Sequence, residues 1–200
     1  MGRPKASLPI GPGDETFLTR IVRTFLDAGV DDVVVVVGHD AEVIIGDFAR
    51  SALPARFVRN VDYDRGQLSS LVVGLGVVDR PGVTAALVTL VDVPLVSPAT
   101  VRTVIERYRQ TRAPIVRPTS GSRHGHPLLI DRSLFAALRS ADPAAGSKPV
   151  VRAHASAAGD VEVDDEGAFT DVDTADDYRR MRLTNRTSGA DDRARNDVDV

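Results

Sequence analysis

The chain has 200 residues, a mass of 21.4 kDa, 42% apolar residues and a formal net charge of −3. This length fits one domain with a single core, and no apolar run approaches the roughly 20 residues of a membrane span, so we expect a cytoplasmic protein without a membrane partner. The chain has no cysteine, which excludes disulfides and thiolate ligands and leaves oxygen or imidazole to hold any metal. Charges of both signs are dispersed, whereas nucleic-acid-binding surfaces concentrate positive charge, so no nucleic-acid partner is expected.

The predicted elements alternate between helices and strands. Apolar residues recur at helical spacing over 16–28, and Gly29 follows where a helix C-cap favours glycine. Five consecutive valines, 33–37, are typical of a strand buried on both faces, as in a parallel sheet. Further strands are expected at 55–60, 84–91, 113–117 and around 161–163. Further helices are expected at 41–52, 66–75, 132–140 and 148–154, and Ser69 or Ser70 would cap the second of these. Two more helices are expected, one that begins at Pro98 behind an N-cap at Ser97 and one after Thr174 with Asp177 as its capping-box acid.

This alternation predicts the fold class. Strands joined through helices form right-handed crossovers, which give an α/β fold with a mainly parallel sheet and helices on both faces. We expect one domain over residues 1–183 and a disordered tail over 184–200, where large apolar residues are nearly absent. In such sheets ligands bind beyond the carboxyl ends of the strands. Asp92 follows the strand at 84–91 and is therefore expected at that functional edge.

Three aspartates could share one divalent cation. Asp92 follows a predicted strand, and Asp171 and Asp173 precede the last predicted helix. Each has a structural alternative, because aspartates at such places often cap a turn or a helix. Two acidic points at strand ends can also hold one hard cation between them, and oxygen ligands suit Mg²⁺.

The first five residues, MGRPK, could supply the opposite charge. Glycine lets a backbone pass close to an anionic ligand, and Arg3 and Lys5 could neutralise that ligand. The alternative is a solvated basic tail. With the aspartates, these residues favour an anionic ligand of small size.

Five stretches in order resemble the nucleotidyltransferase family that includes molybdenum cofactor cytidylyltransferase and its guanylyl relatives: MGRPK, RNVDYDRGQLSSLVVGL, VDVPLV, RHGHPLLI and DVDTADDY. The resemblance covers most of the chain. It implies a Rossmann-like three-layer fold and an enzyme that uses Mg²⁺ to transfer a nucleotidyl group from a nucleoside triphosphate to a phosphorylated acceptor, releasing pyrophosphate. It also implies CTP rather than GTP as the donor, molybdopterin as the acceptor, and transient contact with a molybdoenzyme or its chaperone.

The resemblance also assigns roles to residues. Lys5 resembles the lysine that neutralises the triphosphate, with Gly2 and Arg3 in the same loop. Asp92 resembles the metal-binding aspartate, and Asp171 and Asp173 resemble the late pair that completes the metal site, with either one as the ligand. Two more segments match parts that face the nucleotide and the acceptor, namely Gly66, Ser69 and Ser70 in the first and Gly125, His126 and Pro127 in the second. For His126, a partly buried residue that shapes its turn is an equal alternative.

The sequence departs from the family pattern at its start. Family members carry an apolar strand and a glycine-rich loop just before the residues that match MGRPK, and neither is present here. We therefore expect a translation start upstream of Met1, and an exposed apolar seam where the missing first strand would pair. Two alternatives stay open, a transferase for sugar phosphates or other small phosphorylated molecules and a catalytically silent nucleotide-binding module. The oligomeric state is left open.

Overall fold

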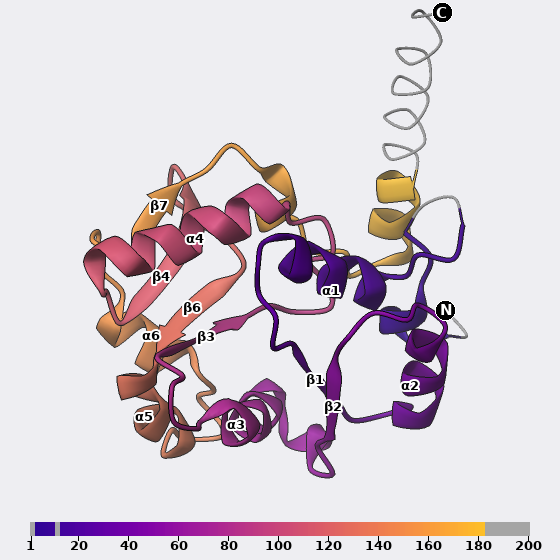
Figure 1. Cartoon of the computed structure of the whole chain (residues 1–200), viewed down its shortest axis with the longest axis horizontal. Coiled ribbons are helices and arrows are strands. Elements are labelled where there is room, and N and C mark those ends of the chain that lie inside the picture. Colours follow the sequence, from indigo (N-terminus) through magenta and orange to yellow (C-terminus); the bar gives the residue numbers. More distant parts are fainter. Residues whose placement is uncertain (1–2, 11–12, 183–200) are drawn as a thin grey trace, which may run out of the picture.

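The computed structural model describes residues 3–10 and 13–182, and Figure 1 shows its strands between helices. The strands are β1 (Val34–Val37), β2 (Arg56–Arg59), β3 (Ala85–Val88), β4 (Ile115–Ser120), β5 (Arg123–His124), β6 (Leu128–Asp131) and β7 (Asp160–Glu162). The α-helices are α1 (Phe17–Asp27), α2 (Ala41–Ala49), α3 (Gln67–Val78), α4 (Pro98–Thr111), α5 (Phe135–Arg139) and α6 (Lys148–His154), and a further helix runs over 175–182. Gly2 and the expected tail at 184–200 lie outside the described residues.

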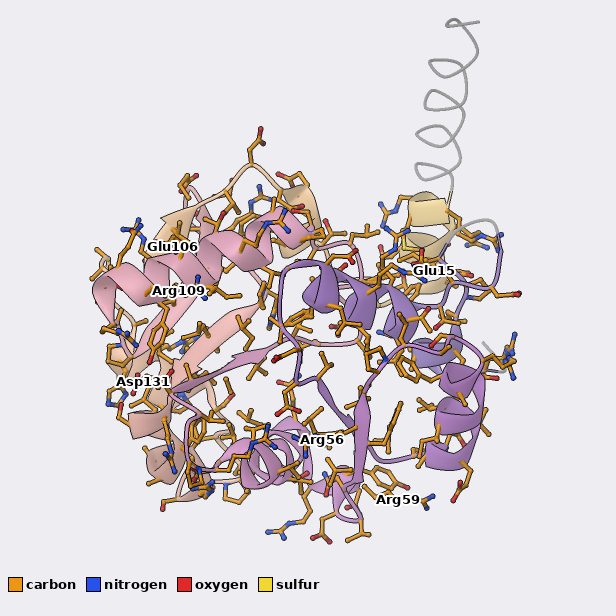
Figure 2. The ribbon with its side chains drawn as sticks, viewed as in Figure 1. Glu15, Arg56, Arg59, Glu106, Arg109 and Asp131 are labelled. Carbon is orange, nitrogen blue, oxygen red and sulfur yellow. The ribbon has the colours of Figure 1, made fainter. Side chains whose placement is uncertain are left out.

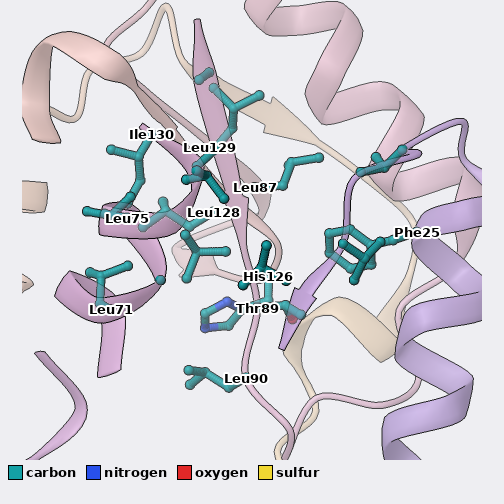
Figure 3. A pocket seen from close by; sticks show the side chains of 18 of the residues that line it. Phe25, Leu71, Leu75, Leu87, Thr89, Leu90, His126, Leu128, Leu129 and Ile130 are labelled. Carbon is teal, nitrogen blue, oxygen red and sulfur yellow. The ribbon is translucent and has the colours of Figure 1, made fainter. Parts of the chain in front are cut away.

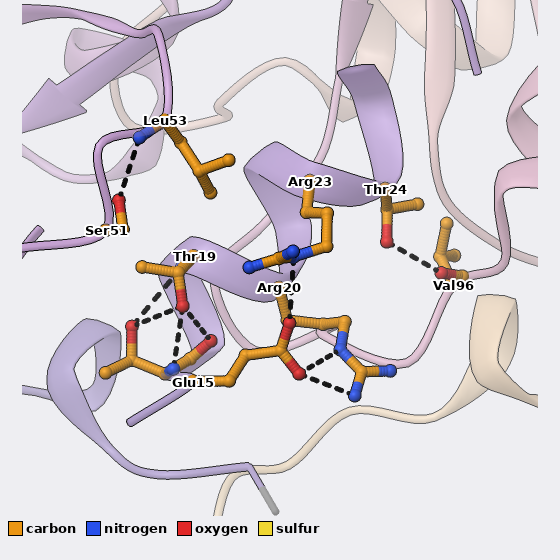
Figure 4. Close-up of polar contacts among 9 residues, drawn as sticks. Glu15, Thr19, Arg20, Arg23, Thr24, Ser51, Leu53 and Val96 are labelled. Carbon is orange, nitrogen blue, oxygen red and sulfur yellow. Dashed lines mark hydrogen bonds and ion pairs between the residues drawn. The ribbon is translucent and has the colours of Figure 1, made fainter. Parts of the chain in front are cut away.

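Local capping explains where α1 begins. Thr16 and Thr19 cap each other, because the Thr19 hydroxyl accepts from the Thr16 amide at 2.7 Å and the Thr16 hydroxyl accepts from the Thr19 amide at 3.3 Å (Figure 4). Glu15 then pairs with Arg20 and Arg23 one turn and two turns along the helix, at 2.8 Å and 3.2 Å. The predicted start of this helix is confirmed.

The predicted caps of two other helices had different outcomes. Ser97 caps α4 as expected, since its hydroxyl accepts from the Thr100 amide at 3.2 Å and Pro98 follows at the first helical position. The prediction that Ser69 or Ser70 caps α3 is wrong. That helix starts earlier, directly after Gly66, whose φ of +96° is open to glycine at little cost.

The strands form two sheets, and the expectation of a mainly parallel sheet is wrong. β1 and β2 form a parallel pair, and β7 runs parallel to β4. In the larger sheet, however, β6 lies between β3 and β4 and is antiparallel to both, and β5 is antiparallel to β4. The reason is the short connection from β4 to β6, which contains only a turn and β5, because a parallel neighbour needs a crossover of a dozen residues or more.

Helices cover both faces of the strands (Figure 1). On one face, Phe25 of α1 and Val101 of α4 pack in one apolar cluster. On the other face, Leu75 of α3 and Leu138 of α5 pack against Ile130 of β6. The result is a three-layer α/β arrangement.

Charged side chains project outward around this core (Figure 2). Glu106 and Arg109, both exposed, form an ion pair at 3.8 Å on the outer side of α4. Arg56 of β2 forms two hydrogen bonds with the Asp32 carboxylate at 2.9 Å and 3.0 Å. Both signs therefore occur together on the surface.

Candidate active site

The segment after β3 places Asp92 at the rim of the larger sheet. Val93 and Val96 next to it are buried in the cluster with Phe25, which fixes the turn. The carboxylate oxygen Oδ1 of Asp92 is buried and has no hydrogen-bond partner among the described residues. A buried acceptor without a donor is costly and therefore unusual in a folded protein.

A distant loop lies against Asp92. The Val172 amide donates a hydrogen bond to the Asp92 carbonyl at 2.8 Å, and the Val172 side chain is buried in a cluster that includes Phe17. This anchor brings Asp171 and Asp173 to the same rim. Burial raises the pKa of the Asp92 carboxyl, and the negative charges of Asp171 and Asp173 raise it further. The predicted convergence of the three aspartates is therefore present in the structure.

Lys5 supplies the positive charge at this rim, and Arg3 does not. The Lys5 ammonium pairs with Asp173 Oδ1 at 2.9 Å, and its charge opposes the upward shift in the pKa of Asp92. The Arg3 guanidinium instead lies 3.8 Å from the Asp47 carboxylate of α2. Of the two cations predicted at the site, the structure brings only Lys5 to the aspartates.

The turn at residues 125–127 also reaches this region. Gly125 fits there because a Cβ atom would lie 2.4 Å from the Ala168 carbonyl oxygen, and the His126 amide donates to that oxygen at 2.8 Å. The peptide bond between His126 and Pro127 is cis. Burial lowers the pKa of His126, although the charges of Asp171 and Asp92 oppose the shift. A neutral ring at pH 7 follows, which suits a residue that shapes the turn.

A buried asparagine holds the segment around Ser69 and Ser70. The side-chain nitrogen Nδ2 of Asn60 donates to Ser69 Oγ at 2.7 Å and to Ser70 Oγ at 2.9 Å. The backbone amide of Asn60 donates to the Val37 carbonyl at 2.8 Å. Asn60 is only 3% exposed. It had no role in the sequence prediction, although it comes directly after β2, and the rule that ligands lie beyond strand ends would have singled it out.

The predicted metal site can be tested against these atoms. Within the described residues, no group of three or more histidine, aspartate or glutamate side chains forms a ready-made metal cage. Mg²⁺ needs no such cage, since it is usually bound by one or two carboxylates, with waters and substrate phosphates as further ligands. The unpartnered Oδ1 of Asp92, with Asp171 and Asp173 nearby, fits this mode of binding. The role of these residues in holding metal stays a prediction.

None of the helices described in the structure is long and apolar enough to span a membrane.

Comparisons with known proteins place the fold and the family. The model of the MobA-like NTP transferase domain matches residues 1–158. The crystal structure of Rv0371C in complex with manganese, from Mycobacterium tuberculosis H37Rv, is similar to this chain with 31% identity and a TM-score of 0.71, covering 91% of this chain and 93% of that one. A nucleotidyl transferase from Methanothermobacter thermautotroptrophicus shares the fold, with a TM-score of 0.74, 24% identity and coverage of 92% and 86%.

A curated relative matches over a shorter stretch. The bifunctional IPC transferase and DIPP synthase of Rubrobacter xylanophilus is 39% identical over 75 residues, which is 37% of this chain and only 17% of that much longer protein. The family assignment therefore depends on the domain match, which covers well over half of the chain. The chain belongs to the MobA-like NTP transferase domain family, a family of nucleotidyltransferases.

Proposed function

We propose that this protein is a Mg²⁺-dependent nucleotidyltransferase that moves a nucleoside monophosphate from CTP to a phosphorylated acceptor and releases pyrophosphate. The observation that carries the proposal is the buried, unpartnered Oδ1 of Asp92 next to two further aspartates and Lys5. An arrangement with one free carboxylate oxygen and an adjacent ammonium group can bind a cation and a polyphosphate together.

This reaction requires compensation of the negative charge on the phosphates more than it requires covalent participation by the protein. An acceptor phosphate oxygen attacks the α-phosphorus, and the bond to the pyrophosphate oxygen breaks with its electron pair leaving on pyrophosphate. The acceptor phosphate is already anionic at neutral pH, so no protein base is needed. Bound Mg²⁺ would neutralise the phosphates and orient them for in-line attack.

The chain's own residues would then divide this work. Asp92, with Asp171 or Asp173, would hold the cation, and Lys5 would neutralise the triphosphate. The Lys5 ammonium pairs with Asp173, and a cation on that carboxylate would free the ammonium group for a phosphate. His126, neutral and buried, would shape the acceptor side of the site, and Ser69 and Ser70, fixed by Asn60, would lie against the nucleotide.

For the acceptor we propose molybdopterin, on the basis of the MobA-like domain match and the motif order. A second candidate acceptor is a sugar phosphate or another small phosphorylated molecule, which the sequence leaves open.

Measurement of pyrophosphate release tests the proposed substrates and the proposed need for Mg²⁺. Each of the four nucleoside triphosphates is paired in turn with molybdopterin and with a panel of sugar and polyol phosphates, with MgCl₂ or with EDTA. We expect release only with Mg²⁺, most strongly with CTP, and loss of release in Asp92→Ala. The matched control is Asp79→Asn, because Asp79 pairs with Arg132 and Arg139 on the surface. Release that survives Asp92→Ala contradicts the metal assignment, and nucleotide binding without release with any acceptor points to the silent module.

A further inference from the structure

One short turn contacts several segments of the candidate site. It is the 3₁₀ helix η4 (Glu166–Phe169), which comes just before the loop that carries Asp171 and Asp173. Its contacts reach the segment after Asp92 on one side and the turn at 125–127 on the other. The position of η4 therefore affects the cation side and the acceptor side of the site together.

Asp165 joins η4 to the segment that follows Asp92. Its carboxylate accepts hydrogen bonds from the Gly167 amide at 3.0 Å and from the Ser97 amide at 3.0 Å, and also from the Thr100 hydroxyl. Gly167 belongs to η4, whereas Ser97 and Thr100 lie in the N-cap and the first turn of α4. One carboxylate thus caps its own turn and holds the beginning of a helix from a distant part of the chain.

Close packing holds the same two segments together. A Cβ atom on Gly167 would lie 2.1 Å from the Leu95 carbonyl oxygen, so the two backbones meet where only glycine fits. Ala168 is 1% exposed and lies in the apolar cluster that contains Val93 and Val96. Because η4 and the segment after β3 share this tightly packed cluster, a shift of one displaces the other.

Arg123 of β5 joins the other side of η4 to the turn at 125–127. Its guanidinium donates two hydrogen bonds to the Glu166 carboxylate, at 2.8 Å and 2.6 Å, and lies 4.8 Å from the centre of the Phe169 ring. An exposed ion pair contributes little when it stands alone. This pair is bidentate and its guanidinium is stacked on an aromatic ring, which fixes its geometry.

A backbone contact continues this link into the site. The His126 amide donates to the Ala168 carbonyl of η4 at 2.8 Å. Figure 3 shows the His126 ring near Thr89, the residue that follows β3, and both line the same cavity. The negative charges of Asp171 and Asp92 oppose the fall in the pKa of His126, so the ring lies within reach of both carboxylates.

We propose that η4 aligns the cation-binding aspartates with the acceptor turn, and that Asp165 and Arg123 are its positioning residues. Asp165 fixes η4 to the segment of Asp92, and Arg123 fixes the acceptor turn to η4. Asp171 follows η4 after Thr170, so its place relative to Asp92 depends on where η4 is held. The effect on transfer rests on the proposed function, and it should be steep, since a misplacement of about 1 Å can cost about 10²-fold in rate.

Asp131 offers a matched control for Asp165. It also caps a 3₁₀ helix, by accepting from the Ser133 amide at 2.8 Å, and it also accepts from a hydroxyl of α4, that of Tyr108. Asp131 pairs with the first residue of β3, at the opposite end of that strand from Asp92. Asp131→Asn therefore removes the same kinds of contact away from the site.

Amide hydrogen exchange on the full chain tests these contacts without any ligand. In Asp165→Asn we expect exchange about tenfold faster at the Val172 amide, which donates to the Asp92 carbonyl, and at the His126 amide. Arg123→Ala should speed exchange at the His126 amide alone, and Asp131→Asn should change neither amide. Equal acceleration of both amides in Asp165→Asn and Asp131→Asn would indicate a general loss of stability and would overturn the proposal.

Titration with Mn²⁺ alone, followed by electron paramagnetic resonance of the free ion, measures the consequence for the cation. We expect Asp165→Asn to raise the Kd for Mn²⁺ about tenfold, and Asp131→Asn to leave it unchanged. Thr100→Val should raise the Kd as well, whereas Thr100→Ser, which keeps the hydroxyl donor to Asp165, should not. If Asp165→Asn does not fold, the two Thr100 variants supply the same comparison. An unchanged Kd in both Asp165→Asn and Thr100→Val would overturn the role of Asp165.

The KM for the acceptor that gives pyrophosphate release tests Arg123. We expect Arg123→Ala and Glu166→Ala each to raise this KM about tenfold with no change in the Kd for Mn²⁺, and the double variant to raise it no further, because both changes break one contact. A normal KM in Glu166→Ala with a raised KM in Arg123→Ala would mean that Arg123 touches the acceptor directly, and would overturn its positioning role.

Failure of the proposed function gives a different result, which is a wild type that neither binds Mn²⁺ nor releases pyrophosphate. The exchange data then decide on η4 alone. Faster exchange at Val172 and His126 in Asp165→Asn, but not in Asp131→Asn, would support η4 as the element that positions these segments, and unchanged exchange would contradict it.

Discussion

Replacing Asp92 by asparagine should stabilise the metal-free protein at neutral pH and at the same time greatly slow transfer. Burial raises the pKa of the Asp92 carboxyl, so the folded state holds the proton more tightly than the unfolded state does. The ionised carboxylate therefore lowers the free energy of unfolding once the pH rises through this elevated pKa. Asparagine keeps the shape of the side chain and removes the charge.

The magnitude follows from the environment of Oδ1. Asparagine leaves a polar atom without a partner at the same position, so the gain comes only from removing the buried charge, and the partial exposure of Asp92 limits the gain to about 1 kcal/mol. For a chain of this size that gain corresponds to a rise in Tm of about 2–4 °C. Transfer should fall by about 10²–10³-fold, the usual loss when one group that compensates transition-state charge is removed.

Thermal unfolding in EDTA measures the stability of the metal-free protein, and thermal unfolding in MgCl₂ measures how much the metal stabilises it. The wild type should gain about 2.7 kcal/mol when Mg²⁺ is present at a hundred times its Kd, and Asp92→Asn should gain far less. Asp79→Asn is the opposite control, since hydrogen bonds from Arg139 and Arg132 lower the pKa of Asp79, and losing that carboxylate should destabilise the fold. A lower Tm of Asp92→Asn in EDTA, or an undiminished response to Mg²⁺, would refute the reasoning.

Three further changes test other parts of the structure. Asn60→Ala should lower the free energy of unfolding in urea by about 1–3 kcal/mol, because the hydroxyls of Ser69 and Ser70 lose the side-chain amide that donates to them. A decrease of less than about 0.5 kcal/mol would contradict the importance of these hydrogen bonds. Ser97→Ala should cost about 1 kcal/mol by removing the cap of α4, whereas Ser97→Thr should retain most of it. Thr174→Ala should raise the pKa of Asp177 from about 2 toward its ordinary value of 3.8, because the Thr174 hydroxyl is the largest cause of the shift. In the wild type this carboxylate stabilises the fold above about pH 3.8 and the contribution disappears as the pH falls toward 2, so carboxyl NMR titration should show the loss at higher pH in the variant.

Several elements could be predicted because their signals are local. The start of α1 at Thr16 and the start of α4 at Ser97 depend on hydrogen bonds between residues three positions apart, which a sequence displays directly. The position of Asp92 at a sheet rim followed from the rule that ligands lie beyond strand ends. The orientation of β6 was not predicted, because strand direction depends on the path of the whole connection and not on residue type.

Contacts between distant residues were decided only by the tertiary structure. The sequence determined which groups are available for the site: three aspartates, the two cations Arg3 and Lys5, oxygen and imidazole ligands, and an α/β chain with apolar strands. It did not determine that Lys5 would pair with Asp173 while Arg3 turned to Asp47, since either cation could neutralise the site. The hydrogen bond from the Val172 amide to the Asp92 carbonyl likewise arises from packing. Local hydrogen bonds set the helices, but the site exists only where buried apolar clusters bring remote segments together.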